Sequence, residues 1–426
     1  MTDRRQAISA QIRALVDEYF ALDAVPGARG TTEIPLHVPS YGAAEVNEAL
    51  ASLLSARVTM GEKVQRFEAL WADYVGAGQA VMVNSGSSAN LIAAEVLRSP
   101  FLPRPLAPGD EVIVPAVAWS TTYFPLVTIG AVPVLVDVDL DTFTLDPKAV
   151  EAAIGPRTRA IVAVHLLGNA CDMAALGALA RRHDLYLLED ACEAHGAEFA
   201  GTRVGAFGQV AAFSFYFSHH ISTIEGGMVV TSDEKLADLA RMLRAHGWQR
   251  DVRKKLDVPN PGIDERYFFV NFGYNLRPME LQGAFGIHQM QRLEPFIRTR
   301  RENAAYWGQA FAKYADRLRL SPGREDRGSR SVWFGYPLSV RPEAPFTRED
   351  LTRFLEGKGI ETRPIMAGNF RDQPAIRLFP HRIAGGLPNA ELIMRASFFF
   401  GNHHAIGEPE RAYVRECVDE FMAGRR

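Results

Sequence analysis

Two adjacent histidines occupy a loop between two apolar stretches of the sequence. The stretch 211–215 leads into His219 and His220, and the stretch 227–231 follows after a Glu-Gly-Gly turn. Glycines at such a turn allow the chain to return tightly. An imidazole titrates near neutral pH, so either histidine can move protons in a reaction. Taken by itself, the pair is interpreted equally well as structural.

Two carboxylates follow the apolar run 185–188, namely Glu189 and Asp190. The carboxyl ends of parallel strands are where open α/β sheets bind their ligands. An aspartate at this place can pair with a protonated pyridine nitrogen and turn the ring into an electron sink. The alternative for Asp190 is a helix N-cap.

A third segment, VNSGSSANLIA (83–93), combines a strand end, a turn of small residues and a helix start. The free N–H groups and the dipole of a helix N-terminus suit a phosphate, and Ser87 and Ser88 add hydroxyl donors. Plain helix capping by serine is the alternative. A fourth segment, Gly273-Tyr274-Asn275, is a loop before a helix.

The elements that position these segments alternate between strand and helix over residues 81–231. Continuous apolar strands predict a mostly parallel α/β sheet covered on both faces. A helix over 8–21 precedes this region, and a long helix from Glu280 to about Tyr314 leads into a smaller α+β region. We predict three parts: an N-terminal helical extension (1–38), a large domain carrying the motifs (39–300) and a small C-terminal domain (301–426).

Composition restricts the class of protein. The 426 residues carry a formal net charge of -3, so no basic field attracts nucleic acid or an acidic membrane. The three cysteines fit neither a disulfide framework nor a metal site. The N-terminus lacks the apolar core of a secretory signal, and no apolar run has the length of a membrane span. We expect a cytoplasmic protein without a metal.

The four segments, in this order and spacing, resemble the DegT/DnrJ/EryC1/StrS family of sugar aminotransferases, which depend on pyridoxal phosphate. The resemblance covers most of the chain, from TMGEKVQRFE (59–68) to ETRPIMAGNFRDQP (361–374). It implies the fold of fold-type I aminotransferases, with a mostly parallel sheet of the seven-stranded type in the large, cofactor-binding domain and a smaller C-terminal α+β domain.

The resemblance also implies roles for individual residues. Asp190 is expected to pair with the pyridine nitrogen, and Glu193 to lie beside the phenolic oxygen, where aminotransferases usually carry glutamine. Asn275 is expected to reach the cofactor phosphate of a partner subunit, which implies a homodimer with shared sites. The remaining expected cofactor contacts are the phosphate-binding Gly86, Ser87 and Ser214 and the ring-stacking Trp119.

One departure from the family pattern decides the expected reaction. The run SFYFSH (214–219) places His219 where the family carries its Schiff-base lysine, and no lysine occurs between Lys148 and Lys235. This resembles the subgroup of sugar-nucleotide 3-dehydratases. Members with an iron–sulfur cluster need several cysteines, whereas here none lies between Cys192 and Cys417. The resemblance therefore points to the cluster-free kind, which acts on GDP-4-keto-6-deoxymannose.

The expected function is deoxygenation at carbon 3 of a nucleotide-linked 4-keto-6-deoxyhexose. It would use pyridoxal and pyridoxamine phosphate with glutamate as amino donor, and His219 would carry the proton. His220 and His246 are candidate substrate contacts. The two histidines of the loop GNHHAIG (401–407) are interpreted as substrate contacts or as surface residues, and the surface is favoured. Two alternatives stay open: an aminotransferase that tolerates the histidine, and a ligand-binding homologue without activity.

Overall fold

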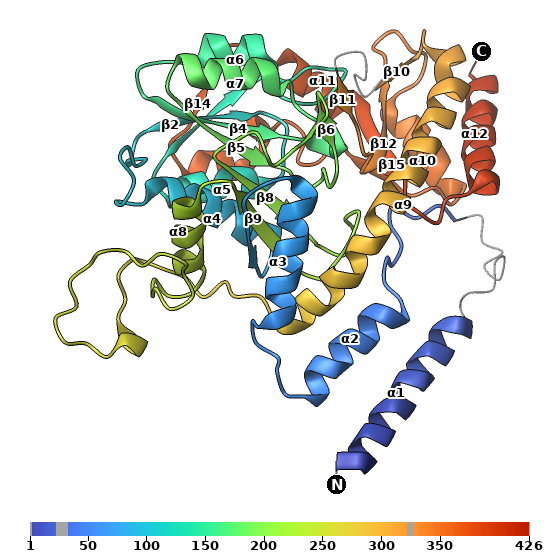
Figure 1. The fold of residues 1–426 in the computed structure, drawn as a ribbon. Helices are drawn as coiled ribbons and strands as arrows, with labels where there is room; N and C mark the ends of the chain where they lie inside the picture. Colours follow the sequence, from blue (N-terminus) through green and yellow to red (C-terminus); the bar gives the residue numbers. More distant parts are fainter. Residues whose placement is uncertain (1, 23–32, 322–327, 426) are drawn as a thin grey trace.

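The computed structural model describes residues 2–22, 33–321 and 328–425 of the chain (Figure 1). Its centre is an eight-stranded sheet in the order β1-β9-β8-β5-β4-β2-β3-β14. All neighbours pair in parallel except β9, which is antiparallel to both β1 and β8. The strands are β1 (Gln79–Val83), β2 (Glu111–Pro115), β3 (Val132–Val136), β4 (Thr158–Val164), β5 (Tyr186–Asp190), β8 (Val210–Ser214), β9 (Gly227–Thr231) and β14 (Arg382–Ile383).

Helices cover both faces of this sheet, as the continuous apolar strands predicted. One apolar core packs the sheet against α4 (Gly86–Arg98), α5 (Ser120–Thr128) and α8 (Glu234–Arg244). The other core packs it against α3 (Glu62–Val75), α6 (Pro147–Ala153) and α7 (Met173–Arg182). The predicted α/β class is confirmed. The eighth strand, β14, is two residues long and comes from the C-terminal part of the chain.

The C-terminal region builds a second, antiparallel sheet in the order β10-β12-β15-β13. Its apolar face packs against long helices around a core that includes Trp307, Tyr336 and Phe400. The strands are β10 (Leu318–Leu320), β12 (Gly335–Val340), β13 (Thr362–Pro364) and β15 (Ser397–Gly401). The helices of this region are α9 (Glu280–Phe311), α10 (Arg348–Gly357), α11 (Pro388–Ala396) and α12 (Glu408–Ala423). A small third sheet joins β6 (Glu198–Phe199), β7 (Thr202–Arg203) and β11 (Ser329–Arg330).

The long helix α9 runs unbroken through residue 300, where we expected the large domain to end. The strand β14 also returns the chain from beyond that residue to the central sheet. The limits at 38 and 300 stay predictions.

The N-terminal helix α1 (Thr2–Leu22) begins earlier than the periodicity predicted, and it packs beside α2 (Ala43–Leu54) (Figure 1). Asn47 donates a hydrogen bond to Asp17 across the two helices, at 2.8 Å. Neither α1 nor any other helix within the described ranges has the length and apolarity to cross a membrane.

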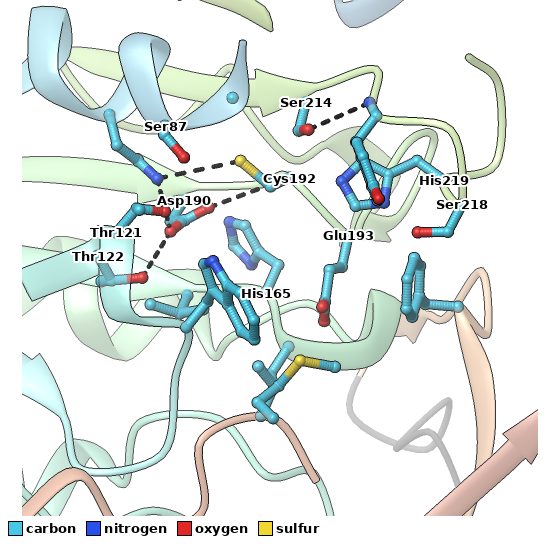
Figure 2. A pocket seen from close by; sticks show the side chains of 18 of the residues that line it. Ser87, Thr121, Thr122, His165, Asp190, Cys192, Glu193, Ser214, Ser218 and His219 are labelled. Atoms are coloured by element: carbon cyan, nitrogen blue, oxygen red, sulfur yellow. Dashed lines mark hydrogen bonds between the residues drawn. The ribbon is translucent and has the colours of Figure 1, made fainter. Parts of the chain in front are cut away.

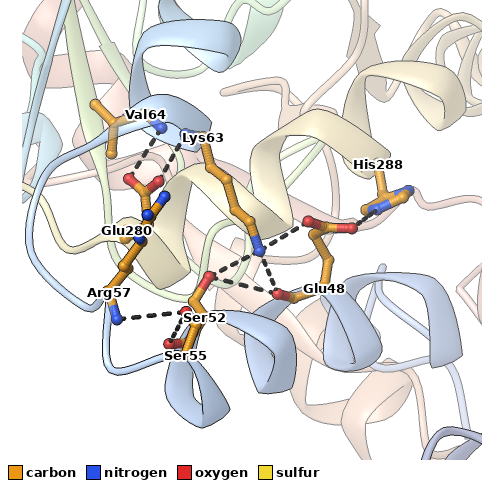
Figure 3. Close-up of polar contacts among 8 residues, drawn as sticks. All are labelled: Glu48, Ser52, Ser55, Arg57, Lys63, Val64, Glu280 and His288. Atoms are coloured by element: carbon orange, nitrogen blue, oxygen red, sulfur yellow. Dashed lines mark hydrogen bonds and ion pairs between the residues drawn. The ribbon is translucent and has the colours of Figure 1, made fainter. Parts of the chain in front are cut away.

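A buried carboxylate joins α9 to the first turn of α3 (Figure 3). Glu280, at the start of α9, accepts hydrogen bonds from the backbone N–H groups of Gly61 and Lys63 at 2.7 Å and of Val64 at 3.3 Å. The ammonium group of Lys63 continues the network to Glu48 on α2 at 2.7 Å. A carboxylate at a helix N-terminus satisfies free donors and suits the helix dipole. These contacts fix the start of α9 against the start of α3.

Candidate active site

A cavity of about 420 Å³ lies where the carboxyl ends of β4, β5 and β8 meet the N-termini of α4 and α5 (Figure 2). Crevices outside the carboxyl ends of parallel strands are the usual ligand sites of open α/β sheets. Its lining brings together most of the predicted site residues, which come from segments far apart in the sequence: Gly86, Ser87, Trp119, Asp190, Glu193, Ser214 and His219.

One end of the cavity is formed by the start of α4. Ser85 caps this helix, because its hydroxyl accepts the N–H of Ser88 at 3.1 Å. Gly86 lies against Ser214 so closely that a Cβ atom on it would stand 2.3 Å from the Ser214 Cβ. Ser87 is exposed at the cavity, whereas Ser88 accepts a hydrogen bond from Ser85 at 3.0 Å. Ser88 is therefore part of the helix cap. The Ser87 hydroxyl and the free backbone N–H groups at the start of α4 remain available to bind an anion.

Asp190 ends β5, and its side chain is only 6% exposed. One carboxylate oxygen accepts from the Thr122 hydroxyl at 2.8 Å and from the Asn90 amide at 3.0 Å. The other oxygen accepts the N–H of Cys192 at 3.3 Å. All three donors are neutral, and within the described residues no cation pairs with Asp190. A protonated ring nitrogen is the kind of partner that such a carboxylate lacks.

Trp119 and Glu193 reach the cavity from two different turns. Trp119 precedes α5 and is 57% exposed, as expected of an indole that is free to cover a bound ring. Glu193 follows β5, and its carboxylate accepts the N–H of Leu167 at 2.8 Å. Burial raises the pKa of Glu193 to about 8, and the nearby Asp190 adds to the rise against the effect of the Leu167 N–H.

His219 presents its ring to the cavity from the loop between β8 and β9 (Figure 2). The ring packs edge-on against Phe334, with centroids 5.4 Å apart. Its Nδ1 atom is buried and has no hydrogen-bond partner within the described residues. Burial, and secondly the charge of Arg300, lowers the pKa of His219 to about 3. The imidazole is neutral at neutral pH and therefore able to accept a proton.

His220 does not line the cavity, contrary to its expected contact with substrate. Its side chain is 0% exposed, and Nε2 lies 3.1 Å from the carbonyl oxygen of Val332. Consecutive residues of a tight loop point in different directions, and here the second histidine turns into the protein interior. Only His219 of the pair is in reach of a ligand in this cavity.

Asn275 and His246 also lie outside the cavity of their own chain. They are neighbours, because Ala245 and Asn275 form an isolated β-bridge and the N–H of His246 donates to Tyr274 at 2.7 Å. Asn275 is exposed, and His246 is half-buried with its ring 4.9 Å from that of Trp248. Both residues stand at one place on the surface.

Comparison with known proteins gives a family for this arrangement. The profile of the DegT/DnrJ/EryC1/StrS aminotransferase family matches residues 39–419. The chain belongs to this family. A GDP-4-keto-6-deoxy-D-mannose 3-dehydratase of Yersinia pseudotuberculosis is 40% identical over 380 residues, which are 87% of this chain and 94% of that protein.

Two solved structures that are described as GDP-4-keto-6-deoxymannose 3-dehydratases share the fold. The E. coli enzyme with bound hydrated PLP is 37% identical, with a TM-score of 0.85, and the match covers 91% of this chain and 99% of that one. A GDP-4-keto-6-deoxymannose-3-dehydratase with a trapped PLP–glutamate geminal diamine has the same identity and TM-score, covering 91% and 100%. The expected membership of the DegT/DnrJ/EryC1/StrS family and the aminotransferase fold are both confirmed.

The structure adds site residues that the sequence analysis did not assign. Asn90 and Thr122 hold Asp190, and His165 lines the cavity from the end of β4. Asn90 lies in the segment VNSGSSANLIA and Thr122 lies three residues after Trp119, but nothing in the sequence indicated which carboxylate they bind. The Nε2 atom of His165 lies 3.1 Å from a carboxylate oxygen of Glu189, the residue before Asp190. The Glu189 carboxylate also accepts hydrogen bonds from three backbone N–H groups of the loop before β8.

The loop GNHHAIG lies deeper than we expected. His403 is buried, with Nε2 3.1 Å from the carbonyl oxygen of Pro35, so the surface interpretation is wrong for this residue. His404 stacks on Phe296 with centroids 4.1 Å apart. Neither histidine lines the cavity.

Proposed function

We propose that this enzyme removes the hydroxyl group at carbon 3 of GDP-linked 4-keto-6-deoxymannose, with glutamate as the amino donor. The observation that carries the proposal is a cavity of the aminotransferase fold that is lined by a neutral His219 and, among the described residues, by no lysine. Membership of the family and the 40% identity to a 3-dehydratase support the substrate class. Glutamate and nucleotide sugars are metabolites of the cytoplasm, where we expect the enzyme to work.

The residues at the cavity fit a phosphorylated pyridine cofactor. Gly86, Ser87 and Ser214 would hold the phosphate, since they offer hydroxyls and free N–H groups around a close approach that only glycine allows. Asp190 would hold the ring nitrogen protonated, because its present donors are all neutral. When bound, pyridoxamine phosphate supplies the amine that condenses with the sugar carbonyl and a ring that takes up an electron pair.

His219 performs the proton transfer in this proposal. As a neutral imidazole it would accept a proton at the 4′ carbon of the bound cofactor and would deliver it to the hydroxyl that leaves carbon 3 of the sugar. A lysine at this place would form a covalent link to the cofactor, which a histidine does not form. The absence of that link favours release of nitrogen over its retention in the sugar.

A homodimer with shared sites is the second part of the proposal. Asn275 and His246 would complete the partner's cavity, the first at the phosphate and the second at the substrate. The segment that carries them exposes large apolar side chains in the single chain: Tyr267 at 65%, Phe269 at 52% and Phe272 at 57%. Clustered exposed aromatic residues are typical of a surface that another chain covers.

An aminotransferase reaction is the second candidate, because the family is described as one of aminotransferases. The two reactions leave different products. With glutamate and the GDP-linked keto-sugar, mass spectrometry of the sugar nucleotide should find a 3-deoxy-4-keto product. A product that has gained an amino group at carbon 4 and kept its carbon 3 hydroxyl would contradict the dehydratase proposal. CDP- and dTDP-linked keto-sugars serve as controls for the nucleotide.

A further inference from the structure

Glu193 is a carboxyl group in the cavity without a charged partner. Its Oε2 atom accepts the N–H of Leu167 at 2.8 Å, and among the described residues no lysine, arginine or histidine forms an ion pair with it. Figure 2 shows the side chain extending into the same cavity as His219. An ionised carboxylate in this place would be held by a single hydrogen bond, which is poor compensation for its lost hydration.

The charged group that acts on Glu193 is negative. Against the effect of burial, Cys171 and Glu189 raise the pKa of His165 to about 10; His165 lines the same cavity but is paired with Glu189 at 3.1 Å. Asp190, three residues earlier, is the carboxylate that acts on it, and His219 across the cavity is neutral. Burial together with Asp190 raises the pKa of Glu193 to about 8. The titratable groups that line the cavity on the elements around it are His165 from β4, Asp190 and Cys192 from β5 and the turn after it, and Tyr216, His219 and Glu225 from the loop between β8 and β9.

The backbone that holds Glu193 is itself unusual. Leu167 has a φ of 54° and the next residue, Gly168, a φ of 82°, so a buried leucine adopts the left-handed conformation that side chains disfavour. The C-terminal region fixes this turn, since Val332 donates to the Gly168 carbonyl at 3.1 Å and Phe334 to the Leu167 carbonyl at 3.0 Å. Strained backbone of this kind concentrates at functional sites. Here it aims one N–H at one oxygen of the carboxyl group, and the other oxygen has no hydrogen-bond partner within the part of the chain that the structure describes.

We propose that Glu193 carries a proton in the resting enzyme and uses it to donate a hydrogen bond to the bound cofactor. The inference rests on the proposed function, because it takes Trp119 and Asp190 as residues that would hold the cofactor in this cavity. Deprotonation removes the donor and places a second negative charge beside Asp190 and an anionic ligand. The affinity for the cofactor should therefore fall as the pH rises through the pKa of Glu193.

The test is the pH dependence of cofactor binding by the full chain. The dissociation constant of pyridoxal phosphate is measured by absorbance from about pH 6.5 to about pH 9.5 for the wild type, Glu193→Gln and Glu225→Gln. In the wild type the constant should rise above about pH 8, approaching about tenfold per pH unit because one proton is linked to binding. Glu193→Gln, which donates at every pH, should show a shallower rise, because only the titration of the free cofactor remains. Glu225→Gln removes another carboxyl group of the cavity and should keep it.

The same rise of the dissociation constant in the wild type and in Glu193→Gln would overturn the proposal. Titration of the free cofactor cannot produce a difference between the proteins, because it affects all three equally. Infrared difference spectra of the wild type provide a second test if the variant fails to fold. They should show a protonated carboxyl band at neutral pH that disappears by about pH 9.5, and no loss of such a band would refute the inference. The enzyme could show this pH dependence of cofactor binding and still yield an amino sugar. That pair of results would support the role of Glu193 and refute only the dehydratase reaction.

Discussion

Replacing His219 by asparagine removes the proton carrier and keeps a polar side chain of similar shape. The pKa of His219 lies at about 3, because burial and the charge of Arg300 disfavour the imidazolium. At pH 7 the imidazole is therefore neutral, so the base is available without prior loss of a proton. Its removal should lower the rate of deoxygenation about 10²- to 10⁴-fold, the usual contribution of a positioned base.

The assay combines two measurements on the same preparation of His219→Asn. Equilibrium binding of pyridoxamine phosphate should stay close to that of the wild type, since Ser87, Ser214 and Asp190 are unchanged. Single-turnover release of the 3-deoxy product should show the loss of rate. In the wild type, the contribution of His219 should persist on the acid side until the pH approaches about 3, because only there does the imidazole become protonated.

His220→Asn is the matched control for this change. It alters the adjacent residue, whose Nε2 faces the Val332 carbonyl oxygen in the interior and not the cavity. Its rate per folded molecule should stay within a few-fold of the wild type, although its stability falls. If His220→Asn abolished the reaction while His219→Asn left it intact, the assignment within the pair would be wrong. If neither variant lost activity, the proton-transfer role would have to lie elsewhere.

Three further predictions concern the cofactor, the dimer and the fold. Borohydride treatment should leave pyridoxal phosphate unlinked to the protein, because no lysine lines the described cavity; a reduced lysyl adduct in peptide mass spectra would refute this. Asn275→Ala should raise the dissociation constant of the cofactor roughly tenfold to a hundredfold by removing a charged hydrogen bond across the dimer, and a fully active monomer would contradict the shared site. Glu280→Ala should lower the free energy of unfolding by about 1–3 kcal/mol, since the N–H groups of Gly61, Lys63 and Val64 at the start of α3 lose their acceptor; Glu280→Gln should recover part of this loss, and an unchanged urea midpoint would refute the role.

The sequence predicted the central architecture because each strand is a short continuous apolar run between helices with clear periodicity. It also brought Asp190, Ser214 and His219 to one site, since each follows or ends a strand of the same parallel sheet. Strand β14 was missed because a two-residue strand has no pattern of its own and is defined by its pairing with β3.

The orientation of single side chains was beyond the sequence. The family pattern singled out His219 as the residue in the lysine position but made His220 a candidate substrate contact, whereas the fold turns His220 toward Val332 and away from the cavity. The same holds for His403, which the sequence placed at the surface and the structure buries against Pro35. The roles of Asn90 and Thr122 were missed because their hydrogen-bond partner, Asp190, lies 100 and 68 positions away in the sequence.

The fate of the glutamate nitrogen tests the dehydratase proposal most directly. The enzyme is incubated with the GDP-linked keto-sugar and glutamate whose amino nitrogen is isotopically labelled, and the label is followed by mass spectrometry in ammonia and in the sugar nucleotide. The proposal predicts that the label leaves as ammonia in step with formation of the 3-deoxy sugar. Label retained in an amino sugar, with the hydroxyl at carbon 3 still present, would contradict it.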